Sequence, residues 1–393
     1  MRALGSALFG ARVGFWAGIA FLTLPITSAL GLFASTDAPL LFLWALGMLL
    51  LWRALEHGSP ARWLGVGIVA GVGLMAKYSM LAFVGSAFLA LLAEPRWRRQ
   101  LARPAPWVGL LVGVAILAPN LVWNWQHGFP TFQHTAEITR VGARGWHPDE
   151  FVELIGAQWL AFGPLLMVLL LWALVRLRDV WPDPRFRFLL AFVVPLLAGV
   201  CVQALTGRAN GNWTAPVFIG ASIVATAFVA QRGRPRLAIV AIALNACLGI
   251  GLYHWPDIVP LAGRALDGRS DPYKRARGWG AMAEAVRPQL AAHPDAVLVG
   301  DERELLAQLI YGLRPARHAR WQASDRIIDH YGLTVPLTTA SGDPVLFVSS
   351  RRDIADVTTR FASARKLCDV DVAVYQNFHR TASIWLLHGF QGY

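Results

Sequence analysis

The first 255 residues hold nine long apolar stretches separated by polar connections. Each stretch is about long enough for a helix to cross the hydrocarbon core of a bilayer, which takes roughly 20 residues. This repeated pattern predicts an all-α polytopic membrane domain with about nine transmembrane helices. The expected spans are 13–33, 38–55, 62–76, 79–94, 105–124, 151–175, 188–205, 213–231 and 237–254.

Arginine is unevenly shared between the two sides of these spans. Alternate connections, with the stretch before the first span, carry 15 basic residues, whereas the opposite turns carry only Lys77, Arg140, Arg144 and Arg208. Cytoplasmic loops retain Lys and Arg, so the 15-residue side is expected to be cytoplasmic. The N-terminus is then cytoplasmic, and everything after the ninth span is outside. The 15 residues are Arg2, Arg12, Arg53, Arg62, Arg96, Arg98, Arg99, Arg103, Arg176, Arg178, Arg185, Arg187, Arg232, Arg234 and Arg236.

The composition agrees with a membrane protein. The 393 residues have a mean hydropathy of +0.45 and only 15% charged residues. The net charge of +12 could suggest nucleic acid, but 19 basic and 9 acidic groups fall in residues 1–255, against 17 and 15 in the remainder. Because the excess lies beside the spans, it indicates contact with anionic membrane lipids and argues against nucleic acid.

The sequence predicts two domains, a membrane domain over residues 1–255 and a small α/β domain over 256–393, which the topology places in the periplasm. In the second domain, apolar spacing predicts helices at 277–293 and 302–313. Strands are expected at 296–299, 345–348, 370–375 and 383–387.

Polar residues of the membrane domain gather at the ends of spans on the side with few arginines, which suggests one site at the outer membrane face. Cations and amides at that depth suit a lipid-linked phosphate, because Lys is a compact point charge and Arg offers two donors. The candidates are Thr36, Asp37, Lys77, Tyr78, Asn124, His127, Arg208, Asn210, Asn212 and Trp213.

Several of these residues also allow a plainer interpretation. Lys77 either binds phosphate or extends its ammonium to the interface. Asp37 either takes part in chemistry or caps the helix of the second span. His127 either holds a divalent metal with an acidic partner or is simply hydrogen-bonded. Asn212 matches a glycosylation acceptor pattern, but it lies too close to a span, so we expect it to face the site.

Three glycines, Gly65, Gly67 and Gly71, mimic part of a dinucleotide-binding fingerprint. They lie inside an apolar span with no preceding strand. Close packing of helices therefore explains them better than a cofactor does.

Short motifs in chain order carry a family resemblance. They are L-F-G-A-R-V-G-F-W-A from Leu8, S-T-D-A-P-L-L-F from Ser35, A-K-Y-S from Ala76, N-x-x-H-G from Asn124, N-W-T-A-P from Asn212, R-G-W from Arg277 and V-L-V-G-D-E-R from Val297. Together they resemble the polyprenyl-phosphate-dependent glycosyltransferases of the GT-C fold. The similar branch contains lipid A aminoarabinose transferases and relatives of dolichyl-phosphate-mannose protein mannosyltransferases.

The resemblance implies an enzyme of the bacterial inner membrane. Such an enzyme takes a hexose or pentose from an undecaprenyl-phosphate carrier and transfers it, at the periplasmic face, to lipid A, another glycolipid or a protein. By position, Asp37 resembles an acidic residue of the family, Lys77 and Tyr78 the carrier-phosphate region, and His127 a histidine that helps to hold a metal. A divalent metal ion is the only cofactor that the resemblance suggests.

One departure from the family pattern concerns the start of the chain. The family begins with a span, a large external loop with an acidic catalytic motif and a second span, whereas this sequence aligns from the third span onward. The resemblance therefore implies that an N-terminal catalytic segment is missing from this chain. A loss of two spans leaves the cytoplasmic N-terminus unchanged.

The leading hypothesis is a GT-C-type glycosyltransferase. Lys77, Tyr78 and Arg208 are expected to bind the donor phosphate, Asp37 to act in catalysis, and Asn124, Asn212 and Trp213 to form the acceptor or loop site. The alternatives are an inactive homologue and a lipid or solute transporter. Transporters tend to show internal repeats and polar groups near the midplane, neither of which is evident in this sequence.

Overall fold

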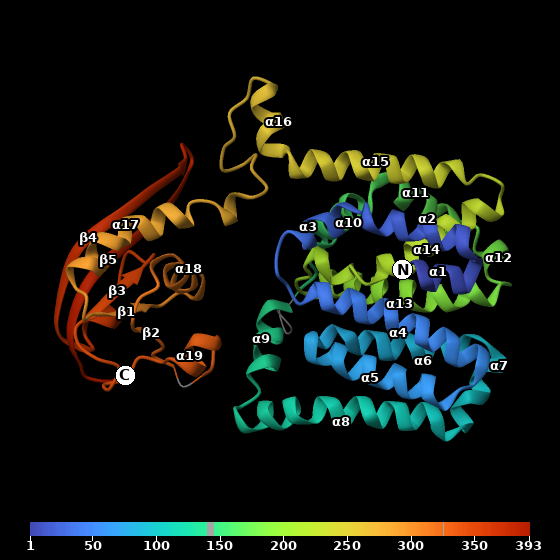
Figure 1. The fold of residues 1–393 in the computed structure, drawn as a ribbon, viewed down its shortest axis with the longest axis horizontal. Coiled ribbons are helices and arrows are strands. Elements are labelled where there is room, and N and C mark those ends of the chain that lie inside the picture. The colour runs from blue at the N-terminus through green and yellow to red at the C-terminus, as the bar shows by residue number, and fades with distance from the viewer. Residues whose placement is uncertain (140–144, 325) are drawn as a thin grey trace. The chain divides into compact units, whose positions relative to one another are not determined.

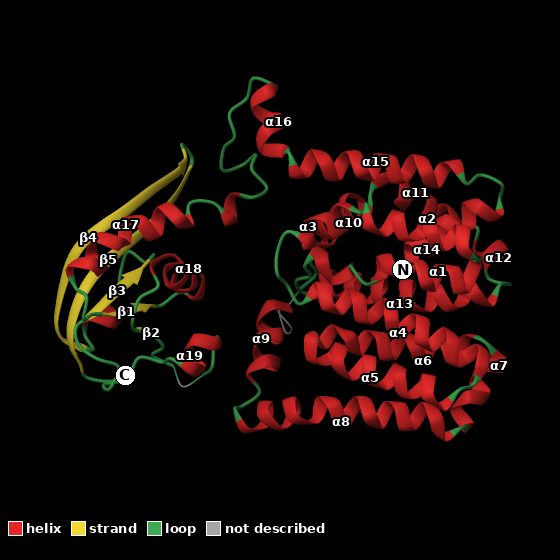
Figure 2. Ribbon diagram, viewed as in Figure 1, coloured by secondary structure: helices red, strands yellow, loops and turns green. Residues whose placement is uncertain are grey.

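The computed structural model describes residues 1–139, 145–324 and 326–393, so Arg140 and Arg144 lie outside the described residues. The chain divides into two compact units, Met1–Tyr253 and His254–Tyr393. The sequence placed this division after residue 255. Figures 1 and 2 show helices throughout the first unit, and helices with a sheet in the second.

Helices account for each of the nine apolar stretches. The first unit contains α1 (Arg2–Phe9), α2 (Ala11–Leu22), α3 (Pro25–Gly31), α4 (Asp37–His57), α5 (Pro60–Ala76), η1 (Tyr78–Met80), α6 (Leu81–Ala93), α7 (Pro95–Arg98), η2 (Arg99–Ala102), α8 (Pro104–Gln126), α9 (Pro130–Thr139), α10 (Pro148–Phe162), α11 (Pro164–Val175), α12 (Leu177–Val180), α13 (Pro184–Thr206), η3 (Gly211–Thr214), α14 (Val217–Gln231) and α15 (Arg236–Tyr253).

Not every stretch is one straight crossing. Among the described residues, four helices (α4, α8, α13 and α15) are long and apolar enough to span a membrane, and up to seven spans result if three bent pairs are each counted as one. The apolar helices α5 and α14 are shorter. The count of nine transmembrane helices therefore stays a prediction.

The expected span over 151–175 is helical but sharply bent. Helices α10 and α11 meet at an angle of 107°. Between them, Gly163 has a φ of 86°, which favours glycine, and Pro164 starts the next helix because its ring fixes φ and has no N–H to donate. Asn245 of α15 donates a hydrogen bond to the Phe162 carbonyl at 3.1 Å, which ties this corner to another helix.

Two of the three glycines singled out in α5, Gly67 and Gly71, pack against glycines of α8, which confirms close helix packing, whereas Gly65 faces Leu50 of α4. A Cβ atom at Gly67 would lie 1.9 Å from the Gly109 carbonyl oxygen, and one at Gly71 would lie 2.8 Å from that of Gly113. The two backbones are thus too close for any side chain. In Figure 1, α5 and α8 lie side by side.

Ion pairs gather the arginine-rich connections at one end of the bundle, which we call the basic end. Arg96 pairs with Glu56, Arg187 with Glu94 and Arg232 with Asp179, and each pair joins two different connections. Glu56 lies in the last turn of α4, Glu94 and Arg96 at the start of α7, Asp179 in α12, Arg187 in the first turn of α13 and Arg232 after α14. The two sides deduced from arginine spacing are therefore real ends of the unit, while the assignment of the basic end to the cytoplasm stays a prediction.

The second unit is a small α/β fold. It contains α16 (Trp255–Leu261), η4 (Lys274–Ala276), α17 (Trp279–Ala292), β1 (Val297–Gly300), α18 (Arg303–Leu313), β2 (His318–Arg320), α19 (His330–Thr334), β3 (Val345–Ser349), α20 (Ala355–Thr358), β4 (Phe361–Tyr375) and β5 (Phe378–Phe390). All six elements expected from the sequence are present, with β4 and β5 longer than expected.

The five strands form one sheet in the order β2-β1-β3-β5-β4, in which β1 pairs in parallel with β2 and β3, and β5 pairs antiparallel with β3 and β4. Alternate residues face two separate cores. Leu298 and Val348 pack with residues of α17 and α18, whereas Val299 and Phe347 pack with Val357 of α20.

Candidate functional site

Three of the predicted site residues meet around one carboxylate at the end of the bundle opposite the basic end. Lys77 Nζ lies 2.6 Å from Asp37 Oδ1, and Asn212 Nδ2 donates to Asp37 Oδ2 at 3.0 Å. The side chain of Asp37 is 6% exposed and that of Lys77 is 25% exposed. The carboxylate is therefore buried and shared, while part of the ammonium remains accessible.

The chain brings these residues together through three helix ends. Asp37 is the first residue of α4, where the positive end of the helix dipole favours a carboxylate. Lys77 has extended backbone (φ −162°, ψ 131°) between α5 and η1, so it ends one helix before the next begins. Asn212 lies in η3. Asp37 thus begins a helix, Lys77 follows the end of one, and Asn212 lies in the short turn between α13 and α14.

These contacts change two interpretations made from the sequence. Asp37 makes no side-chain cap at the start of α4, because its carboxylate oxygens face Lys77 and Asn212. The Lys77 ammonium forms an ion pair with Asp37, so it does more than extend toward the interface. Neither the phosphate interpretation nor the interface interpretation of Lys77 included this pair between residues 40 positions apart.

A second polar network surrounds Tyr78. The Tyr78 hydroxyl donates to Asn120 Oδ1, and Asn124 Nδ2 donates to the Tyr78 oxygen at 3.2 Å. Asn124 is fully buried, and its Oδ1 accepts a hydrogen bond from the backbone N–H of Thr131 at the start of α9. Asn124 therefore links α8, η1 and α9 and holds the connection that follows α8.

Sequence reasoning missed Asn120. It lies one helical turn before Asn124 on α8, and it follows Pro119 inside an apolar run. A signal was present, because Asn120 and Asn124 stand four residues apart and so lie on the same face of a helix. Only the packing of α8 beside η1 shows that Tyr78 is their partner.

Two further predicted residues, Arg208 and His127, make no contact with the Asp37 carboxylate among the described residues. The Arg208 side chain is exposed, and its backbone N–H donates to the Thr139 carbonyl at 3.0 Å. His127 is also exposed, donates through Nδ1 to the Trp123 carbonyl at 2.8 Å and stacks on the Trp123 ring. Their predicted roles in phosphate and metal binding stay predictions.

Trp213, next to Asn212, lines a groove between α6 and α13. The space measures about 440 Å³ and is mostly apolar. Gln158 and Thr214 are both buried, and they hydrogen-bond to each other and to the Gly211 carbonyl. These bonds hold η3 against α10. The groove thus opens beside a rigid turn that also carries Asn212. Its lining residues are Ala82, Gly85, Ser86, Thr139, Pro195, Leu196, Gly199, Val200, Gln203 and Trp213.

The predicted metal site at His127 has no acidic partner in the contacts of the described residues. No group of three or more His, Cys, Asp or Glu side chains is placed to hold a metal ion within the part of the chain that the structure describes. His127 uses Nδ1 in its hydrogen bond to Trp123, which leaves Nε2 as the single nitrogen available to a ligand. We therefore derive no chemical step through a metal.

Comparisons with known proteins agree with the resemblance found in the motifs. Residues 3–123 match the dolichyl-phosphate-mannose-protein mannosyltransferase family. The lipid A galacturonosyltransferase RgtD of Rhizobium johnstonii is 28% identical over 313 residues, which is 79% of this chain and 64% of the relative. The lipopolysaccharide core galacturonosyltransferase RgtA of the same organism is 27% identical over 283 residues, or 63% of this chain and 55% of the relative.

The fold has a solved counterpart. The crystal structure of ArnT from Cupriavidus metallidurans in the apo state matches with a TM-score of 0.60 and 16% identity, covering 98% of this chain and 80% of that chain. The chain spans 64% and 55% of the lengths of its two curated relatives. Together, the matches confirm the resemblance to GT-C glycosyltransferases.

Proposed function

We propose that this protein is a membrane glycosyltransferase that takes a sugar from a polyprenyl-phosphate carrier and transfers it to lipid A or to the lipopolysaccharide core. The names of the two curated relatives support this acceptor class and make galacturonic acid the first sugar to test. By this proposal the reaction takes place at the end of the bundle that carries Asp37, on the periplasmic face.

The accessible ammonium of Lys77 carries the proposal. An ammonium has three N–H donors, and within the described residues Asp37 is the only hydrogen-bond partner of Nζ. The other donors are free to bind the phosphate of a carrier lipid. The ion pair with the buried carboxylate keeps the ammonium in place, so the site is arranged before the substrate arrives.

In the proposed reaction, an acceptor hydroxyl oxygen attacks the anomeric carbon of the sugar. The bond between that carbon and the phosphate oxygen breaks, and the lipid phosphate leaves with the electron pair. Lys77 stabilises the charge that grows on the leaving phosphate. Tyr78 and Arg208 are proposed to contribute further donors, and Asn212 and Trp213 to contact the acceptor.

Asp37 has two roles within this proposal. In the structure, both carboxylate oxygens accept hydrogen bonds, so Asp37 first acts to position Lys77. When the phosphate draws the ammonium away, Oδ1 becomes free to accept the proton of the acceptor hydroxyl. Such proton transfer contributes roughly a hundred- to ten-thousandfold to the rate of enzymes that use it.

The test is a sugar-transfer assay with the purified protein in liposomes that contain lipid A. The donor is polyprenyl-phosphate galacturonate, and a second donor carries a neutral hexose. Transfer to lipid A that depends on the lipid-linked donor supports the proposal. Movement of the donor lipid across the bilayer without sugar transfer would instead indicate a transporter and would overturn it.

A further inference from the structure

Two backbone groups fix the orientation of the Asn124 side-chain amide on α8. The Thr131 N–H, which can only donate, lies 3.3 Å from Asn124 Oδ1. The Asn120 carbonyl oxygen, which can only accept, lies 3.0 Å from Asn124 Nδ2. Exchanging the oxygen and nitrogen of this amide would place donor against donor and acceptor against acceptor. The Nδ2 group of Asn124 therefore faces Asn120 and Tyr78.

The direction of the Tyr78 hydroxyl proton follows from this orientation. Asn124 Nδ2 lies 3.3 Å from Asn120 Oδ1 and 3.2 Å from the Tyr78 oxygen. Because Nδ2 can only donate, both of these oxygens accept from it. Tyr78 has a single hydroxyl proton, and it donates that proton to Asn120 Oδ1. Tyr78 can therefore donate to a ligand only after its hydrogen bond to Asn120 has broken.

The hydrogen bond between Tyr78 and Asn120 can be exchanged without leaving either oxygen unpaired. If the Tyr78 proton turns away, Asn120 Oδ1 and the Tyr78 oxygen both still accept from Asn124 Nδ2. The exchange thus avoids the cost of an unpaired acceptor in a partly buried network. A phosphate oxygen is charged, and hydrogen bonds to charged groups are about twice as strong as those between neutral groups. A phosphate beside Tyr78 would therefore win the proton from Asn120.

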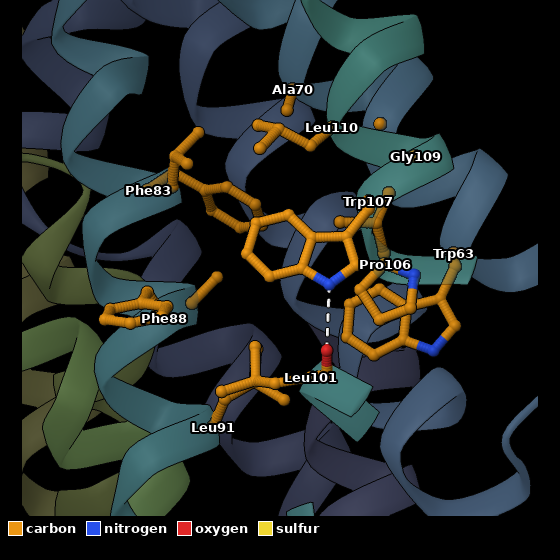
Figure 3. A pocket seen from close by; sticks show the side chains of 14 residues that line it. Trp63, Ala70, Phe83, Phe88, Leu91, Leu101, Pro106, Trp107, Gly109 and Leu110 are labelled. Carbon is orange, nitrogen blue, oxygen red and sulfur yellow. Dashed lines mark hydrogen bonds between the residues drawn. The ribbon is translucent and has the colours of Figure 1, made fainter. Parts of the chain in front are cut away.

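The helix that carries both asparagines is held beside η1, which begins with Tyr78. Helix α5 leads into η1, and the contact between Gly67 and Gly109 brings α5 against α8. Near the start of α8, Trp107 Nε1 donates to the Leu101 carbonyl at 2.8 Å (Figure 3). The packing that positions η1 thus also holds the two asparagines against the Tyr78 hydroxyl.

We propose that Asn120 is a positioning residue for the phosphate of the lipid-linked donor, a role that rests on the proposed function. Before the phosphate binds, Asn120 holds the Tyr78 hydroxyl in one direction. When the phosphate binds beside Lys77, the hydroxyl turns and donates to it, and the O–H bond stays intact. Asn120 does not contact the substrate in this proposal, because it acts through Tyr78.

Binding of undecaprenyl phosphate without a sugar tests this role, measured by native mass spectrometry of the full chain in detergent. Asn120→Leu keeps the size of the side chain but removes the acceptor, so the Kd should rise about fivefold, which corresponds to about 1 kcal/mol. Tyr78→Phe should raise the Kd by a similar factor. The variant Asn120→Leu/Tyr78→Phe should bind no more weakly than Tyr78→Phe, because two residues that act through one contact are not additive.

Two further variants separate positioning from a general loss of structure. Asn120→Ala removes the same acceptor without adding an apolar branch, so it should raise the Kd in the same way and serves if the leucine variant does not fold. Asn245→Ala removes another side-chain hydrogen bond of the membrane unit, to the Phe162 carbonyl. It should lower the unfolding temperature and leave the Kd unchanged.

The outcomes distinguish this role from the proposed function itself. Unchanged binding by both Asn120 variants, or additive losses in the double variant, would overturn the role of Asn120 and leave the proposed function standing. A wild type that does not bind undecaprenyl phosphate would overturn both.

Discussion

Two buried carboxylates, Asp37 in the membrane unit and Asp271 in the C-terminal unit, each pair with a cation but differ in what the cation can still do. Asp271 is fully buried and accepts from the Tyr273 N–H, from Arg277 Nε and from the Tyr375 hydroxyl, at 2.6–2.8 Å. Within residues 1–139, 145–324 and 326–393, Asp37 accepts side-chain hydrogen bonds from Lys77 and Asn212 only. The first carboxylate is saturated with donors, whereas the second holds an ammonium with donors to spare.

By our proposal, this difference separates a structural ion pair from a functional one. Asp271 joins the segment before α17 to β4, and each of its partners has its place in the fold. Lys77 ends a helix and directs one donor to Asp37, and its remaining donors have no partner among the described residues. We propose that they bind a substrate. The two carboxylates are similarly buried, so what distinguishes their ion pairs is the number of hydrogen-bond donors that the cation has left unused.

The largest effect is expected at Lys77. Lys77→Met removes the cation that we propose to stabilise the leaving phosphate, so turnover should fall at least about tenfold, or about 1.4 kcal/mol of transition-state stabilisation. Single-turnover kinetics with the lipid-linked donor would measure it. Lys366→Met is the matched control, because Lys366 is an exposed lysine of β4 that pairs with Asp369.

A double variant separates catalysis from folding at this pair. Lys77→Met alone leaves a buried carboxylate without its cation, which destabilises more than removing both partners does. The variant Asp37→Leu/Lys77→Met should therefore unfold at a higher temperature than Lys77→Met and still be inactive. Full turnover in either variant would make the Asp37–Lys77 pair structural, like that of Asp271.

A smaller effect, on stability rather than turnover, is expected at Asp271. Burial favours the protonated form, but hydrogen bonds from Tyr375, Tyr273 and Arg277 outweigh it and lower the pKa of Asp271 below its ordinary value. A group with a lowered pKa stabilises the fold above its unfolded pKa, and this stability is lost as the pH falls through the folded pKa. In the wild type, the unfolding temperature of the C-terminal unit should therefore fall below about pH 4.

The variant Asp271→Asn checks this pH dependence. It should cost about 1 kcal/mol near neutral pH, the usual contribution of a hydrogen bond, and the loss below pH 4 should become shallower. Hydrogen exchange of the β4 and β5 amides reports on this unit within the full chain. An identical acid profile in wild type and variant would show that Asp271 does not set it.

A feature of this fold could be predicted from the sequence when neighbouring residues determine it. Apolar runs and arginine spacing are local, so the nine apolar helical stretches and the two ends of the bundle could be predicted, whereas α9, in the connection between two predicted spans, was not. The strand β2 has only three residues and was missed, and the bend at Gly163 was read as a continuous span. Glycine followed by proline was the local signal for that bend.

The site was only partly predictable for the same reason. Asp37, Lys77 and Asn212 could be assigned to one end of the bundle, because each lies at a span terminus on the same side. Their mutual contacts join residues 40 and 175 positions apart, which no spacing rule reveals. Asn120 shows the opposite case, in which a polar residue within an apolar run was overlooked and proved to be the partner of Tyr78.

The smallest effect is expected at the basic end, where ion pairs lie near water. Arg96 and Glu56 are 3.1 Å apart with side chains that are 53% and 32% exposed. Exposed pairs of this kind contribute about 0.2–1 kcal/mol and are screened by salt. Arg96→Gln should therefore lower the unfolding temperature only slightly, less so at high salt, and leave turnover unchanged. A loss of turnover close to that of Lys77→Met would mean that the two ends of the bundle are coupled. Unused donors on a buried ion pair would then not be a sufficient criterion for identifying the active site.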